Sequence, residues 1–183
     1  MALLNAESLR KIQAELRKYP ADQKQSAVMS ALAIAQDQHG WLPNELMEEV
    51  ARALEMPPVA VFEVATFYNM YNLQPLGKHK LVMCTNLPCA LSGAVEAAEH
   101  LKRRCGVEEF NQTSADGRFT VKEGECFGAC GDAPVMLVDN KRMCSRMTAA
   151  QIAPFENGLG CIDRRMSTPF MERATENCPS SPP

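Results

Sequence analysis

Several common site motifs are missing from this 183-residue chain. No two cysteines are separated by two residues, which is the C-x2-C spacing of zinc knuckles and of thiol–disulfide oxidoreductases. Neither G-x-G-x-x-G nor G-x-x-x-x-G-K-[ST] occurs, so no nucleotide-binding loop is visible. The three histidines are scattered, and no general acid–base machinery is evident. We therefore expect no complete active site on this chain alone.

Long apolar runs are missing as well. No stretch approaches the roughly 18 consecutive apolar residues of a membrane span. The first eight residues have neither the basic start nor the apolar core of a secretory signal. We expect a cytoplasmic protein, in which thiols stay reduced. Eight cysteines in such a protein indicate metal binding or catalysis before disulfides.

Charge of one sign is not in excess. The chain has 19 Lys and Arg against 22 Asp and Glu, a net charge of -3, and no run of five like charges. A surface for nucleic acid therefore has no global electrostatic support. With 46% hydrophobic and 22% charged residues, the composition is that of an ordinary globular protein.

The first 75 residues predict a small helical domain. Apolar residues recur there at spacings of three and four, which is the period of a helix with one buried face. Gly40 stands where a glycine commonly follows a helix. The expected helices cover residues 6–19, 23–39, 43–54 and 59–71. Among the aromatic and sulfur-containing residues at the end of this region, Phe62, Phe67, Tyr68 and Met70, a core position is favoured over an interface for each.

The pattern changes after a linker at residues 74–77. Strands are expected over 79–85 and 118–121, and a hairpin over 134–144 with its turn at Asp139–Asn140. A helix is expected over 90–104, with Val95 facing the core, and another from 148 to 155. This order predicts a mixed α/β domain over residues 76–161. Residues 162–183 are polar and rich in Pro and Ser, which predicts a disordered tail.

Two cysteine pairs border the predicted strands. Cys84 and Cys89 form a C-x4-C motif, and Cys126 and Cys130 form a C-x3-C motif. Both pairs can therefore lie on loops at one end of the sheet. Four thiolates suit a tetrahedral metal ion or a [2Fe–2S] cluster, which needs two thiolates at each iron.

Glycines surround the second cysteine pair. Gly124, Gly128 and Gly131 allow the backbone to come close to a site, to adopt positive φ and to aim N–H groups at sulfur. These features favour an anionic cluster. A zinc-stabilised binding module without a redox role stays open as an alternative, although its usual C-x2-C spacing is absent.

Four segments together resemble one known family. They are residues 21–29, 63–71, 82–89 (Val-Met-Cys-Thr-Asn-Leu-Pro-Cys) and 124–136 (Gly-Glu-Cys-Phe-Gly-Ala-Cys-Gly-Asp-Ala-Pro-Val-Met). The chain is similar in them, and over about residues 6–157, to the thioredoxin-like [2Fe–2S] subunit, known as the E-type subunit, of bacterial NADH:quinone oxidoreductase, respiratory complex I. Close relatives of that family serve NAD-linked hydrogenases and formate dehydrogenases, and the cluster motif does not separate these.

The resemblance implies a fold and a role. The fold is α+β, an N-terminal helical bundle followed by a thioredoxin-like [2Fe–2S] ferredoxin domain. Cys84, Cys89, Cys126 and Cys130 are implied to be the ligands of one cluster. The chain would exchange electrons with FMN on a partner subunit, which also carries the NADH site. Other peripheral-arm subunits are further partners, at the cytoplasmic face of the inner membrane.

Three smaller expectations follow. Thioredoxin-like folds commonly carry a cis-proline before a strand, and Ala133–Pro134 has that position. Cys105 and Cys144 lie outside the motifs and are expected to be buried apolar residues. Cys161 and Cys178 are expected to be exposed, with no role indicated.

Overall fold

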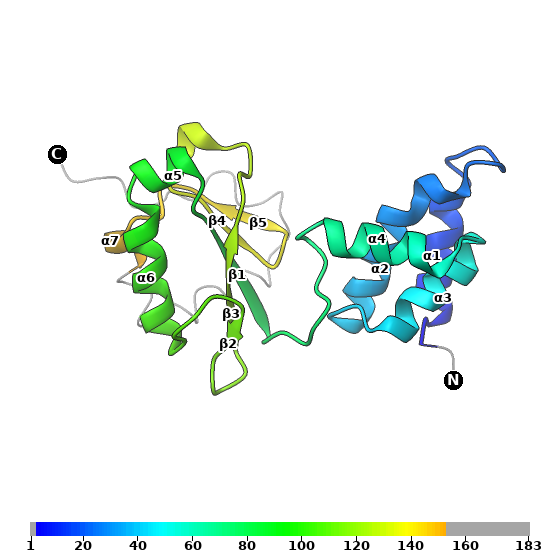
Figure 1. The fold of residues 1–183 in the computed structure, drawn as a ribbon, viewed down its shortest axis with the longest axis horizontal. Coiled ribbons are helices and arrows are strands. Elements are labelled where there is room, and N and C mark those ends of the chain that lie inside the picture. The colour runs from blue at the N-terminus through cyan, green and yellow to red at the C-terminus, as the bar shows by residue number, and fades with distance from the viewer. Residues whose placement is uncertain (1–2, 153–183) are drawn as a thin grey trace.

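The computed structural model describes residues 3–152 of the chain. It has two parts in Figure 1, a helical bundle drawn in blue and cyan, and a mixed sheet in green and yellow that carries its own helices. The elements of the bundle are α1 (Ala6–Leu16), a 3-10 turn η1 (Lys24–Ala27), α2 (Val28–His39), α3 (Asn44–Leu54) and α4 (Pro58–Phe67).

The bundle follows its sequence signals closely. Asn5 caps α1, since its side chain accepts a hydrogen bond from the Ser8 amide at 2.7 Å. Helix α2 ends at Gly40, whose φ of 89° lies in the left-handed region. The apolar faces enclose one core, in which Ile12, Leu32 and Leu46 are fully buried. The four helical segments predicted from periodicity are all present.

The end of the bundle differs from the prediction. Helix α4 ends at Phe67, because the backbone of Tyr68 is extended at φ -93° and ψ 119°. Phe62 packs against the core, as expected. Phe67 does not, because 80% of its surface is exposed, and Tyr68 and Met70 also reach solvent. The expectation of core positions is therefore wrong for Phe67.

The second part is built on a five-stranded sheet in the order β2-β3-β1-β4-β5. Its strands are β1 (His79–Cys84), β2 (Gln112–Thr113), β3 (Phe119–Gly124), β4 (Met136–Val138) and β5 (Arg142–Cys144). Strands β1 and β3 are parallel, and the other neighbouring pairs are antiparallel. The turn between β4 and β5 has positive φ at both Asp139 and Asn140, as a type I′ turn requires. The predicted α+β fold is confirmed.

Helices cover the sheet on the side away from the bundle (Figure 1). They are α5 (Leu87–Leu91), α6 (Ala94–Cys105) and α7 (Ala149–Ile152), and a 3-10 turn η2 (Cys130–Asp132) follows the second cysteine motif. The single helix expected over 90–104 is in fact two, broken at Gly93, which has φ 90°. Leu101 of α6 faces the core, as expected, and so does Ala97. The expectation is wrong for Val95, which is 55% exposed.

The two parts are joined by hydrogen bonds as well as by the chain. Lys80 of β1 is only 4% exposed, and its Nζ donates to Asn72 Oδ1 at 2.9 Å. Asn140 Nδ2 donates to the Met70 carbonyl at 2.8 Å. Lys141 pairs with Asp37 of α2 at 3.0 Å. The segment between α4 and β1, residues 68–78, is thus held against the sheet and is called the linker from here on. The predicted domain boundary at residue 75 stays a prediction.

Lys80 gives this junction a testable pH dependence. Burial lowers the pKa of Lys80 to about 8, and Lys122 lowers this pKa further, whereas Asp139 opposes the change. Between pH 8 and the ordinary pKa of 10.5, the unfolded chain binds a proton that the folded chain has released. Stability therefore rises with pH in this window, by about 1.4 kcal/mol per pH unit and about 3 kcal/mol in total.

Urea unfolding of wild type and Lys80→Met between pH 7 and 10.5 measures this effect, because other titrating groups are common to both proteins. We expect wild type to gain stability relative to Lys80→Met as the pH rises through the window. The exposed Lys11→Met variant controls for the loss of one positive charge. A constant difference across the window would contradict the prediction.

Candidate metal centre

The sheet brings both cysteine pairs to one edge, which is formed by the carboxyl ends of the parallel strands β1 and β3 and is called the cysteine edge below. Cys84 ends β1, where it is paired in register with Gly124 at the end of the parallel strand β3. Cys89 lies in α5 directly after β1, and Cys126 and Cys130 follow β3. Because parallel strands end at the same edge, the two motifs meet although 36 residues separate Cys89 from Cys126. The predicted placement at one end of the sheet is confirmed. Of the four cysteines only Cys126 lies in a loop, since Cys84 ends β1, Cys89 lies in α5 and Cys130 begins η2.

The second pair is spaced for one metal. The sulfurs of Cys126 and Cys130 are 3.8 Å apart. Two thiolates bound tetrahedrally at about 2.3 Å to one metal are also about 3.8 Å apart. The Gly128 amide donates to Cys126 Sγ at 3.3 Å, which is the kind of N–H contact that stabilises a ligand sulfur.

The first pair is buried, in contrast to the exposed second pair. Burial raises the pKa of the Cys84 thiol, and the neighbouring Cys89 thiol raises this pKa further. The backbone N–H groups of Asn86 and Phe127 act in the opposite direction. Asn86 belongs to the first cysteine loop and Phe127 to the second, so residues of both loops influence the Cys84 thiol.

The pairs are also within electrostatic reach of each other. The pKa of the Cys130 thiol is raised chiefly by its hydrogen bond with Cys126, then by the charge of Cys126, and also by the charge of Cys89. Thiolates gathered in this way repel one another. A cationic iron centre between them would remove that repulsion.

The donor set fits a [2Fe–2S] cluster. The thiols lie as two pairs, Cys84 with Cys89 and Cys126 with Cys130. A [2Fe–2S] cluster takes two thiolates at each of two irons. Two cysteine pairs at one edge, with amide N–H groups aimed at the sulfurs, match this requirement.

Hydrogen bonds join the two cysteine loops. The Thr85 amide donates to the Gly124 carbonyl at 3.2 Å, and Thr85 Oγ1 donates to Glu123 Oε1 at 2.5 Å. Asn86 Nδ2 donates to Glu125 Oε2 at 3.0 Å. The sequence patterns did not point to these residues. One signal was available for Asn86, since Asn before a Leu-Pro start is typical of a helix N-cap.

The three glycines differ in their roles. A side chain at Gly124 would place its Cβ 2.6 Å from Val82 Cγ1 and 2.7 Å from Phe127 Cζ. Gly128 has a φ of +72°, which disfavours other residues. Gly131 has neither a close neighbour nor a positive φ. Positive φ is therefore confirmed at Gly128 and is absent at Gly124 and Gly131, whereas Gly124 is needed for close packing. The approach of these glycines to a cluster stays a prediction.

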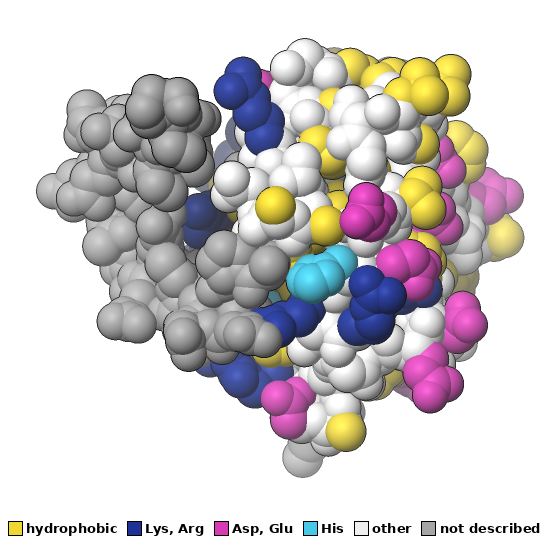
Figure 2. Space-filling model, turned by 90° about the vertical axis from the view of Figure 1, so that its left-hand side faces the viewer, with side chains coloured by type: hydrophobic (Ala, Val, Ile, Leu, Met, Phe, Trp, Pro, Cys, Tyr) yellow, Lys and Arg dark blue, Asp and Glu magenta, His cyan; other side chains and the backbone are white. Residues whose placement is uncertain are grey.

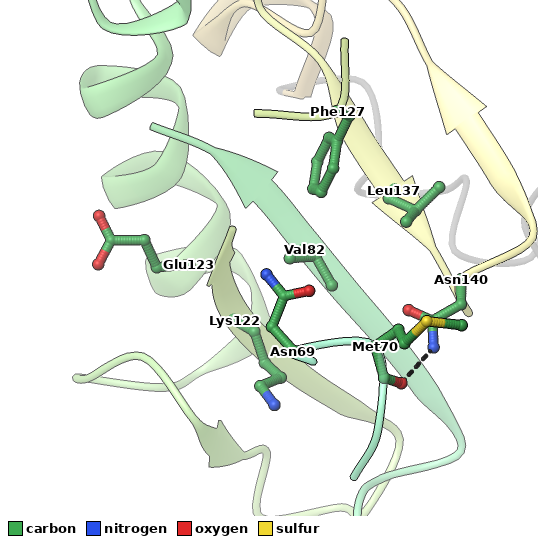
Figure 3. A pocket seen from close by; sticks show the side chains of 8 residues that line it. All are labelled: Asn69, Met70, Val82, Lys122, Glu123, Phe127, Leu137 and Asn140. Carbon is green, nitrogen blue, oxygen red and sulfur yellow. Dashed lines mark hydrogen bonds between the residues drawn. The ribbon is translucent and has the colours of Figure 1, made fainter. Parts of the chain in front are cut away.

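A pocket lies on the bundle side of the sheet beside this edge. In Figure 3, Phe127 of the second cysteine loop, Val82 of β1 and Leu137 of β4 line one part of it, and Asn69 and Met70 of the linker approach from the bundle. The hydrogen bond from Asn140 to Met70 closes one end. Phe127 thus lines this pocket and also packs against the buried cluster that contains Cys84 and Cys89.

The remaining described cysteines are structural. Cys105 is buried in the core below α6, and burial raises its pKa to about 11. Cys144 packs partly buried against the same core. The expected buried position is confirmed for Cys105, and Cys144 is only partly buried. Cys161, Cys178 and the predicted tail lie outside the described residues.

The Ala133–Pro134 bond is cis, as predicted. It precedes Val135, whose carbonyl accepts a hydrogen bond from the Cys84 amide at 3.0 Å. The segment containing the cis-proline therefore adjoins the cysteine edge.

The face that carries α6 has mixed charge. Figure 2 shows positive and negative side chains interspersed there, and hydrophobic side chains gather toward its upper part. In Figure 1, helix α5 lies at the top of the part of the molecule that contains the sheet. Its Leu87 and Leu91 are exposed. In the described part of the chain, no helix is both long and apolar enough to cross a membrane.

Comparison with known proteins gives one family. The family model of the thioredoxin-like [2Fe–2S] ferredoxins matches residues 12–155. The E-type subunit of the NADH-quinone oxidoreductase of Rickettsia bellii (strain RML369-C) is 41% identical over 126 residues, 68% of this chain and 75% of the relative. An E-type subunit of the same enzyme from Rhizobium meliloti (strain 1021) is 42% identical over 127 residues, 69% of this chain and 74% of the relative.

A solved structure shares the fold. An NAD+-reducing [NiFe]-hydrogenase in the air-oxidized state matches 80% of this chain with a TM-score of 0.62 and 23% identity. The matched region is 25% of that hydrogenase chain. At this identity, the likeness concerns the fold alone.

Proposed function

Because this chain belongs to the thioredoxin-like [2Fe–2S] ferredoxin family, we propose that it is an electron-transfer subunit of an NADH:quinone oxidoreductase. It holds one [2Fe–2S] cluster through Cys84, Cys89, Cys126 and Cys130. The observation that carries the proposal is the meeting of both cysteine pairs at one sheet edge, inside the region that matches the family.

The chain's own residues hold the cluster and set its surroundings. When bound, the cluster supplies one-electron redox chemistry. The four thiolates would bind iron. The Gly128 amide donates to Cys126 Sγ, and the backbone N–H groups of Asn86 and Phe127 lower the pKa of Cys84. Such N–H groups near sulfur would stabilise the negative charge that reduction adds. Cys84 and Cys89 are buried, whereas Cys126 and Cys130 face the surface. This exposed side is where a redox partner can approach.

The two-electron chemistry of NADH belongs to a partner subunit in this proposal. That partner carries FMN and the NADH site, since the present chain has no nucleotide-binding motif. The partner subunit and the present chain both belong to the peripheral arm in this proposal, at the cytoplasmic face of the inner membrane. A diaphorase module of an NAD-linked hydrogenase is the second candidate, because the cluster motif is shared with that class of protein. The 41% identity to the E-type subunit, against 23% to the hydrogenase chain, favours the first.

Metal and sulfide analysis tests the proposal. We expect anaerobically purified protein to contain about two irons and two acid-labile sulfides per chain, and to give the EPR signal of one unpaired electron after dithionite reduction. Zinc without sulfide, in protein from cells that assemble clusters, would identify a structural zinc module. Co-purification from native membranes or from the soluble fraction distinguishes the respiratory complex from a soluble hydrogenase.

A further inference from the structure

Asn86 contacts both cysteine motifs at once. Its Oδ1 accepts a hydrogen bond from the Leu87 amide at 3.0 Å, which caps the N-terminus of α5, the helix that contains Cys89. Its Nδ2 donates to Glu125 Oε2 at 3.0 Å, and Glu125 directly precedes Cys126.

We propose that Asn86 is the positioning residue that holds the C-x4-C and C-x3-C motifs at the spacing of one cluster. This inference rests on the proposed function. A single amide side chain can do this because it has both a donor and an acceptor, and each end serves a different motif.

The helix cap matters because α5 is short. It has only five residues, and a helix of that length is not stable by itself. Its own N-cap and its packing therefore hold Cys89 in place. The capping residue Asn86 is also bonded to Glu125, which directly precedes Cys126. The position of Cys89 is therefore coupled to the start of the second cysteine loop.

The Glu125 bond has a different effect from the neighbouring Thr85 bonds. Thr85 joins the ends of β1 and β3 through Glu123 and the Gly124 carbonyl, and so continues the ladder between two parallel strands. The Asn86–Glu125 bond lies beyond the last paired residues, where the ladder no longer fixes the loops. It is charge-assisted, and such bonds are about twice as strong as neutral ones.

An exchange of the two side chains tests the proposal. Asn86→Asp keeps an acceptor for the Leu87 amide but loses the donor, and it places two carboxylates against each other. We expect this variant to lose iron to a chelator about tenfold faster than wild type, with an altered EPR line shape. In Asn86→Asp combined with Glu125→Gln, the new amide donates to the new carboxylate. The reversed pair should return the rate to within about twofold of wild type.

Two single variants complete the test. Glu125→Gln keeps an acceptor for Asn86, so its rate should stay within about threefold of wild type. Asn44→Asp makes the same chemical change in α3, far along the chain from the cysteines, and should have no effect. Equal rates for wild type and Asn86→Asp, or a combined variant that loses iron as fast as Asn86→Asp, would overturn the inference. Wild-type protein without iron and sulfide would instead overturn the proposed function.

Discussion

A Cys126→Ser protein should retain less than about a tenth of the wild-type iron after gel filtration, and should lose the visible absorption of the cluster. The reason is the pairing of the thiols. Cys126 Sγ lies 3.8 Å from Cys130 Sγ and receives the Gly128 amide, so its loss leaves one iron with a single thiolate. A serine hydroxyl is a harder and much less acidic ligand than a thiol, and it is poorly matched to iron in this type of site.

The matched control is Cys105→Ser. Cys105 is buried in the core below α6, away from the two motifs, and the change exchanges the same pair of atoms. This variant should unfold at a lower urea concentration, because a hydroxyl replaces a buried thiol, yet keep its iron and its EPR signal. Cys84→Ser should behave like Cys126→Ser. An unchanged visible spectrum in Cys84→Ser or Cys126→Ser would defeat the ligand assignment.

A Gly124→Ala protein should be destabilised by about 1–3 kcal/mol and should release its cluster faster than wild type. The added methyl would lie 2.6 Å from Val82 Cγ1 and 2.7 Å from Phe127 Cζ. Val82 is buried in the central strand β1 and has little freedom to move. The displacement would therefore fall mostly on Phe127, which lies between Cys126 and Gly128 and would move the second cysteine loop with it.

Gly131→Ala is the control for this prediction. Gly131 is adjacent to Cys130, but an added Cβ has no neighbour within 4 Å and the backbone is not left-handed. Its urea midpoint and its rate of iron loss should stay close to those of wild type. Equal urea midpoints and rates of iron loss for Gly124→Ala and wild type would show that the loop accommodates the methyl group.

Local sequence patterns predicted most of the fold. The helices of the bundle follow from apolar periodicity, and the Gly40 cap and the Asp139–Asn140 turn follow from residues that tolerate positive φ. Strand β2 escaped prediction because it has only two residues, both exposed, so it leaves no alternation of buried and exposed positions. The helix expected over 90–104 is present as α6 from Ala94, but its start was misplaced for a similar reason. Its apolar residues continue across Gly93, and only the left-handed backbone there shows the break.

The sequence by itself determined the family of this protein. The spacing of the four motif cysteines and the segments around them indicated the family, which the comparisons confirm, while the ligand assignment stays a prediction. Only the tertiary structure decided what holds those cysteines together. The parallel register of β1 and β3 sets Cys84 opposite Gly124, and the Asn86–Glu125 bond joins residues 39 positions apart. Such contacts depend on which strands become neighbours. That choice depends on the burial of the whole sheet, and no local pattern near either residue records it.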